Sequence, residues 1–221
     1  MERVIQLQVG ERVGLVEGLL QVPASPALLY VFAHGAGAGM RHPFMAQIAT
    51  RLQELRAATL RYQFPYMQSG RGRPDVPAVL EGTVRAAIRE GRALLPDVPL
   101  IAGGKSMGGR MTSQLLAKEP DLPVKGIAFV GFPLHQPNKP GRARAAHLFD
   151  VVQPMLFVQG TRDALANLAL MKEVTAELGP KAVLHIIDGA DHSFGVPKKS
   201  GRTAADVQEE IARAIVEFGL R

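Results

Sequence analysis

The chain has 221 residues, with 26 Lys and Arg against 20 Asp and Glu, and it contains no cysteine. A chain of this length can bury one sizeable core, so we expect one domain over residues 1–221, and the absence of cysteine excludes disulfides, thiolate zinc sites and a cysteine nucleophile. The net charge of +6 favours anionic partners, but the charges are scattered and no Trp is present for base stacking, so we expect no nucleic-acid partner.

Membrane and export signals are weak in this sequence. No apolar run approaches the roughly 20 residues that a membrane span needs. The stretch MERVIQLQVGERVG lacks the basic start and the apolar core of a signal peptide. We therefore expect a cytoplasmic protein with no membrane partner, and we leave its oligomeric state open.

Hydrophobic periodicity predicts strands that alternate with helices. Residues 4–9 and 13–22 form an early strand pair, expected to be antiparallel. The later strands, several of them continuous apolar runs that suit burial on both faces, are predicted at 27–34, 57–64, 98–104, 124–132, 154–160 and 181–188. The helices are predicted at 43–55, 75–95, 107–119, 164–178 and 203–220, with Asp75 and Thr203 opening the second and the last. Residues 131–153 are expected to be irregular, with one short helix near 143–149.

This alternation predicts an α/β fold, in which a mainly parallel sheet of about seven to eight strands carries helices on both faces and a minimal cap. Right-handed crossovers place every strand-to-helix loop at the carboxyl edge of such a sheet. Ligands of open α/β sheets bind at that edge. We therefore expect the functional residues in these loops.

The stretch IAGGKSMGGR, residues 101–110, fits two different motifs. Its letters GKS resemble the end of a phosphate-binding P-loop, but that motif needs a glycine where Pro99 stands. The letters GKSMG also fit G-x-S-x-G, the sharp turn that presents a nucleophilic serine between a strand and a helix. A strand is predicted before this turn and a helix after it, so the context favours Ser106 as a nucleophile over an inert serine in a glycine-rich turn.

A serine hydroxyl needs a base and an orienting carboxylate to act as a nucleophile. Asp163 follows the strand at 154–160, and His192 follows the last strand, which gives the order Ser, Asp, His that this kind of sheet uses. Alone, Asp163 would suit an N-cap and His192 an ordinary loop histidine. Asp188 and Asp191 are alternative carboxylates, of which Asp188 is the stronger alternative.

An acyl-transfer site also needs backbone N–H groups aimed at the developing oxyanion. The first such donor is expected to be the residue after the serine, Met107. The second is expected in HGAGAG, residues 34–39, where we choose Ala36, with Gly35 as the alternative. Glycines in this loop let the backbone approach a substrate closely.

Together these motifs resemble the α/β-hydrolase fold, and within it the compact, dienelactone-hydrolase-like members. HGAGAG, GKSMGG, VQGTRD and GADHSF correspond to that fold's oxyanion loop, nucleophile elbow, acid turn and histidine loop. The chain also resembles a family of small, mostly uncharacterised bacterial hydrolases, whose signatures are similar to HGAGAGMRHPFM, FPYM, GGKSMGGRM, VQGTRD, and DHSF followed by KKSGRT. Its eukaryotic relatives include a testis-expressed protein and a subunit of a histone-acetyltransferase complex.

The resemblance covers nearly the whole chain and implies a Ser-His-Asp hydrolase scaffold without an agreed substrate. Dienelactone hydrolases use a cysteine nucleophile, which this chain lacks, so their substrate is not carried over. Some relatives are thought to act as scaffolds, which keeps a catalytically silent binding module as the alternative function. A peptidase or an acyltransferase with the same triad is a third possibility.

We expect a serine hydrolase that cleaves a small-molecule ester or thioester and needs no metal or cofactor. Gly35, Tyr66 and Met67 are expected to contact the substrate, because the loops that carry them reach the carboxyl edge. Two arginine pairs lie in nearby loops and could meet an anionic group, although a solvated basic surface is favoured: Arg71 with Arg73, and Arg142 with Arg144. The insertion at 136–150 is too short for a large lid, which argues against a long-chain lipase.

Overall fold

The computed structural model describes residues 2–221, and most of these residues lie in strands and helices. The strands are β1 (Glu2–Gly10), β2 (Gly14–Gln21), β3 (Leu28–Ala33), β4 (Ala57–Tyr62), β5 (Leu100–Lys105), β6 (Gly126–Val130), β7 (Met155–Gly160) and β8 (Ala182–Ile187). The α-helices are α1 (Pro43–Glu54), α2 (Pro65–Gln68), α3 (Pro77–Leu94), α4 (Met107–Lys118), α5 (Leu168–Leu178) and α6 (Ala204–Gly219). Short 3-10 helices are η1 (Ala143–Phe149), η2 (Gly179–Lys181) and η3 (Lys198–Ser200).

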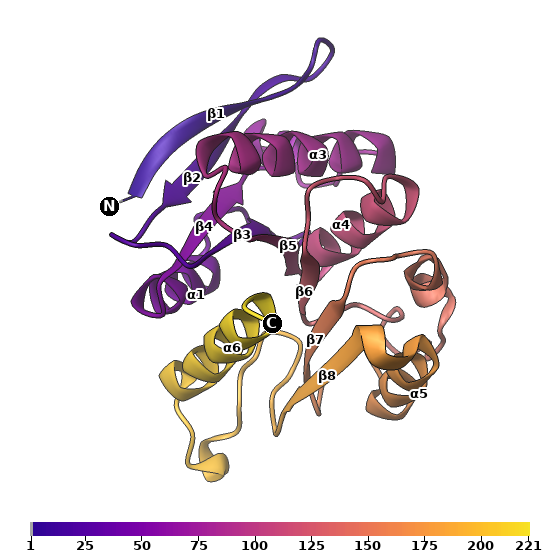
Figure 1. The fold of residues 1–221 in the computed structure, drawn as a ribbon. Coiled ribbons are helices and arrows are strands. Elements are labelled where there is room, and N and C mark those ends of the chain that lie inside the picture. Colours follow the sequence, from indigo (N-terminus) through magenta and orange to yellow (C-terminus); the bar gives the residue numbers. More distant parts are fainter. Residues whose placement is uncertain (1) are drawn as a thin grey trace.

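The strands form one sheet in the order β1-β2-β4-β3-β5-β6-β7-β8 (Figure 1). β1 pairs with β2, and β2 pairs with β4, in antiparallel register. From β4 to β8 every neighbouring pair is parallel. The predicted fold class, a mainly parallel sheet with helices on both faces, is confirmed.

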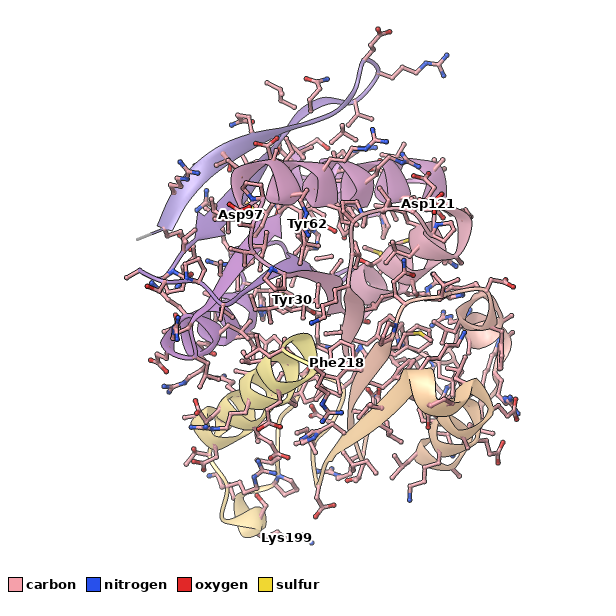
Figure 2. All side chains as sticks on the ribbon, viewed as in Figure 1. Tyr30, Tyr62, Asp97, Asp121, Lys199 and Phe218 are labelled. Atoms are coloured by element: carbon pink, nitrogen blue, oxygen red, sulfur yellow. The ribbon has the colours of Figure 1, made fainter. Side chains whose placement is uncertain are left out.

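Two helical layers cover the sheet. Helices α3, α4 and α5 lie on one face, and α1 and α6 lie on the other (Figure 1). Figure 2 marks the two sides: Tyr62 packs in the cluster that contains α3, and Tyr30 packs in the cluster that contains α6 and Phe218. Both tyrosines are fully buried, as suits strands covered on both faces.

Local capping moves several predicted boundaries. α5 begins at Leu168 rather than 164, because the Asn167 side chain accepts the N–H of Leu170 and sets the helix start. α3 begins at Pro77 rather than Asp75, whose carboxylate instead accepts the N–H of Tyr66. The predicted cap of the last helix holds, since Thr203 and Asp206 form a reciprocal capping box.

None of the helices within residues 2–221 combines the length and the apolar character that crossing a membrane requires.

Candidate active site

Ser106 lies at a strained turn between β5 and α4. Its backbone has φ 51° and ψ −116°, a conformation that non-glycine residues rarely adopt and that costs on the order of 1–3 kcal/mol. A Cβ at Gly104 would lie 2.5 Å from the carbonyl oxygen of Ala33, and one at Gly108 would lie 2.5 Å from that of His34. Glycine is therefore required on both sides of the serine, because the end of β3 packs directly against the turn.

Three loops bring the predicted nucleophile, base and acid together. His192 Nε2 lies 2.9 Å from Ser106 Oγ, and His192 Nδ1 lies 2.7 Å from Asp163 Oδ2. The three residues follow β5, β7 and β8 at the carboxyl edge of the sheet. A carboxylate accepts the proton on Nδ1, which leaves Nε2 free to accept the serine hydroxyl proton.

Asp163 uses its two oxygens for different purposes. Oδ1 accepts the backbone N–H of Leu165 at 2.7 Å and thereby holds the turn before α5. Oδ2 accepts both His192 Nδ1 and the side-chain amide of Gln159, the latter at 2.5 Å. The side chain of Asp163 is only 1% exposed. Asp163 therefore lies where an orienting carboxylate is expected, but it is not the N-cap of α5, which is Asn167.

The alternative carboxylates face elsewhere. Asp188 Oδ1 accepts the hydroxyl of Thr161 at 3.3 Å. Asp191 Oδ1 accepts the N–H groups of Ser193 and Gly195, at 2.8 and 2.9 Å, and closes the turn that carries His192. Within residues 2–221, Asp163 is the carboxylate hydrogen-bonded to the His192 ring.

The two predicted oxyanion donors lie beside the serine. Ala36 lines the same pocket as Ser106, and Met107 is the first residue of α4, directly after the serine. Among the described residues, neither the N–H of Ala36 nor that of Met107 donates a hydrogen bond to another group. Neither N–H group is therefore engaged by another group of the described chain.

His34 fixes the peptide that carries the Ala36 N–H. Its Nε2 accepts the N–H of Phe64 at 3.1 Å, so its proton is on Nδ1, which donates to the carbonyl oxygen of Gly35 at 2.7 Å. The C=O of Gly35 and the N–H of Ala36 belong to one planar trans peptide and point in opposite directions. Burial of His34 lowers its pKa to about 4, with the hydrogen bond to Gly35 opposing that shift, so the ring is neutral at pH 7.

The pocket beside Ser106 has a volume of about 270 Å³. The oxyanion loop, the start of α1 and the His192 turn form its walls. Its lining consists of Gly35, Ala36, Gly37, Ala38, His42, Phe44, Met45, Lys105, Ser106, His192 and Ser193. Phe44 stacks on Phe194, with ring centroids 5.8 Å apart. The pocket-lining residues of α1 were not predicted from the sequence, although α1 begins only four residues after the predicted oxyanion loop.

Gly35 lines this pocket as predicted, whereas Tyr66 and Met67 do not. Tyr66 is fully buried behind the oxyanion loop, and Met67 packs against the core. Tyr66 and Met67 are turned away from the pocket because they lie in the short helix α2, which begins soon after β4. The hydrogen bond from the Tyr66 N–H to Asp75 holds this helix in place.

Lys105 is a second residue that the sequence analysis missed. It lines the pocket, and its Nζ donates to the main-chain oxygen of His192 at 2.7 Å. Burial lowers the pKa of Lys105 to about 8, and the carboxylates of Asp163 and Asp191 oppose part of that shift.

The arginines near this edge are largely engaged by the protein itself. Arg71 pairs with Asp75 at 2.8 Å, and Arg142 pairs with the carboxylates of Glu173 and Glu177 on α5. Arg144 donates to the carbonyl oxygen of His135 at 3.0 Å. No group of three or more His, Asp or Glu side chains that could hold a metal ion occurs within residues 2–221.

Comparisons with known proteins identify the family and the fold of the chain. A family described as alpha/beta hydrolase domain matches residues 26–219. A dienelactone hydrolase from Anabaena variabilis has a TM-score of 0.75 and 22% identity over 98% of this chain and 97% of its own. A serine hydrolase without lid from Xanthomonas campestris has a TM-score of 0.76 and 18% identity over 98% and 94% of the two chains. An esterase domain from Rhodothermus marinus has a TM-score of 0.74 and 16% identity over 100% and 98%. With a strained serine turn, a hydrogen-bonded histidine and a family match over most of its length, the chain belongs to the alpha/beta hydrolases.

Proposed function

We propose that the protein is a serine hydrolase that cleaves a small carboxylic ester or thioester through an acyl-enzyme. The observation that carries the proposal is the continuous series of hydrogen bonds from Ser106 through His192 to Asp163, which opens on a pocket next to two unused N–H groups. The names of similar structures, a serine hydrolase without lid and an esterase domain, support the same reaction class.

The reaction proceeds in two acyl-transfer steps. His192 takes the hydroxyl proton as Ser106 attacks the carbonyl carbon, and Asp163 stabilises the imidazolium that forms. The N–H groups of Ala36 and Met107 bind the oxyanion of the tetrahedral intermediate. His192 then protonates the leaving alcohol or thiol, and the ester of Ser106 remains. Water that His192 deprotonates attacks this ester and releases the carboxylic acid.

The size and walls of the pocket favour a short acyl group. Its volume of about 270 Å³ lies below the roughly 300–1,000 Å³ of typical ligand pockets, and a cavity of about 150 Å³ can hold a benzene ring. Phe44 and Met45 give an apolar wall, which suits an aliphatic or small aromatic acyl chain.

The insertion between β6 and β7 does not form a large lid over this pocket. Its helix η1 packs on α4, where the His147 ring bonds to the hydroxyl of Ser113 at 2.7 Å, on the opposite side of the sheet from α1. A short insertion fixed in this way supports a substrate that binds from open solvent rather than a long lipid chain.

The alternative function is a binding module that keeps the fold without turnover. A panel of nitrophenyl esters and acyl thioesters, from acetyl to decanoyl, separates the two functions when it is run with the wild type and with Ser106→Ala. Hydrolysis that is fastest for short chains and lost in Ser106→Ala supports the proposal. The absence of turnover from a folded wild type on every ester and thioester supports the binding module.

A further inference from the structure

Lys105 connects the turn of the nucleophile with the turn of the base. It is the last residue of β5, directly before Ser106, and its Nζ donates to the main-chain oxygen of His192 at 2.7 Å. Within the described residues, the other hydrogen bond between these two turns is the bond from His192 Nε2 to Ser106 Oγ. When the serine bond is broken during the reaction, Lys105 keeps the main chain of His192 attached to the serine turn, while Asp163 holds the ring.

The surroundings of the Lys105 ammonium leave little freedom for its Nζ. Gly131 follows β6 with φ 71°, and a Cβ there would lie 3.2 Å from Nζ and 3.4 Å from the ring of Phe194. The centroid of the Phe194 ring lies 5.5 Å from Nζ, and Phe194 is only 4% exposed. The ammonium thus has a glycine and a buried aromatic face beside it, and an aromatic face suits a cation.

Burial makes a charged ammonium on Lys105 unfavourable unless the charge stabilises another group of the protein. An ammonium has three N–H donors, and in residues 2–221 only one of them has a partner, with no carboxylate within ion-pair distance. The titratable groups that face it are Asp163 after β7, and Asp191 and His192 after β8. An apolar side chain of similar length would avoid the cost of desolvating the ammonium.

The turn that carries His192 is closed on itself. Asp191 Oδ1 accepts the N–H groups of Ser193 and Gly195, and the N–H of Asp191 donates to the carbonyl oxygen of Gly195 at 3.0 Å. This leaves the carbonyl oxygen of His192 as the point at which Lys105 holds the whole turn. The bond from Lys105 thereby fixes the main chain from which the imidazole projects, and the bond to Asp163 fixes the ring itself.

We propose that Lys105 is a positioning residue for the general base, and that its charge-assisted bond to the His192 carbonyl holds the imidazole in line with Ser106. This rests on the proposed function, since it assigns Lys105 to the same site. The bond is strongest while the ammonium is charged, because charge-assisted bonds are about twice as strong as neutral ones. The pKa of Lys105, lowered to about 8 by burial, places the loss of that charge within a measurable pH range.

The test compares Lys105→Met with Lys181→Met in the full chain. Lys181 is a matched control, because its Nζ also donates to main-chain carbonyls, those of Val151 and Phe149, at 2.6 and 3.2 Å, and these lie outside the site. Two properties are measured: amide hydrogen exchange of residues 190–196, and kcat and KM on the best ester from pH 6 to 10.

We expect faster exchange at residues 190–196 in Lys105→Met only. We expect its kcat to fall by about 10- to 100-fold with KM little changed, because a misplacement of about 1 Å can cost 10²-fold. In the wild type kcat should decline as the pH rises through about 8, and this decline should be missing in Lys105→Met. If Lys105→Met does not fold, Lys105→Gln, which removes the charge and keeps a donor, replaces it with the same expectations.

The proposal would be overturned if Lys105→Met kept the kcat and the pH profile of the wild type. It would also be overturned if amide exchange at residues 190–196 were the same in Lys105→Met as in the wild type. If the wild type hydrolyses nothing, the proposed function has failed, and the exchange measurement alone then decides whether Lys105 anchors the turn.

Discussion

The hydroxyl of Tyr66 donates a hydrogen bond of 2.8 Å to the carbonyl oxygen of Ala36, from behind the oxyanion loop. The ring of His34 holds the preceding carbonyl, that of Gly35, at 2.7 Å. Two consecutive peptides of this loop are thus fixed by buried side chains, which orients the Ala36 N–H before any substrate arrives. Preorganised donors of this kind are the largest single source of rate enhancement in many enzymes.

Replacing Tyr66 by Phe tests this preorganisation. We expect Tyr66→Phe to lower kcat by about 10-fold or more with little change in KM, because an oxyanion donor contributes mainly in the transition state. The matched control is Tyr30→Phe, since Tyr30 is also fully buried and donates at 2.8 Å to a main-chain oxygen, that of Ala128. Tyr66→Phe removes the hydrogen bond to Ala36 and Tyr30→Phe removes that to Ala128, each worth about 0.5–1.5 kcal/mol in stability. An equal loss of kcat in both would contradict a specific role for Tyr66.

The stability of the fold should depend on pH through His34. Its pKa is about 4 in the folded protein and 6.5 in the unfolded chain, so between these values the unfolded chain binds more protons. The free energy of unfolding must therefore fall as the pH drops through this window, by about 2 kcal/mol between pH 7.5 and 5 from this group alone. Urea unfolding of wild type and of His34→Gln at both values measures the difference. An identical pH dependence of the two proteins would refute it.

Asp163 and Asp188, two of the carboxylates near His192, should respond differently to replacement by amides. Asp163→Asn should lower kcat by about 10⁴-fold, because an amide no longer holds Nδ1–H and leaves the imidazole in the wrong tautomer. Asp188→Asn should have little effect, since Asp188 contacts Thr161 rather than the ring. Steady-state kinetics of both variants on one ester checks that Asp163 is the carboxylate that orients His192. A larger loss of kcat in Asp188→Asn than in Asp163→Asn would refute this assignment.

Shortening Phe44 should change the preferred chain length. Phe44 lines the pocket and stacks on Phe194, so Phe44→Ala opens space at the acyl end. We expect the ratio of kcat/KM for an octanoyl ester to that for a butanoyl ester to rise by about 10-fold or more, since each buried methylene is worth about 0.8 kcal/mol. Phe149→Ala, at an exposed phenylalanine of η1, is the control. An unchanged ratio in Phe44→Ala would place the acyl chain elsewhere.

The features that could be predicted from the sequence are those that depend on buried strands and on the order of the loops along the chain. The apolar runs around Val31 and Phe157 identified the parallel strands, and the order of Ser106, Asp163 and His192 along the chain followed from the topology that such strands impose. The order of the motifs along the chain is enough to predict that these three residues lie near one another, because every strand-to-helix loop lies at the same edge of the sheet.

Side-chain directions were not predictable in the same way. Tyr66 was expected in the pocket and lies behind the oxyanion loop, because the turn of α2 depends on a bond to Asp75, nine residues further on. The roles proposed for Phe44 and Lys105 depend on where α1 and the His192 turn pack, which no local pattern encodes. Tertiary contacts between distant loops decide these positions.

Covalent labelling measures whether Ser106 is the activated nucleophile that the proposed function requires. Wild type, Ser106→Ala and His192→Ala would each be treated with a fluorophosphonate and analysed by intact mass. We predict one added phosphonyl group on the wild type and none on either variant, because the hydroxyl needs His192 as its base. A folded wild type that stays unlabelled, or a Ser106→Ala variant that labels as fast as the wild type, would contradict it.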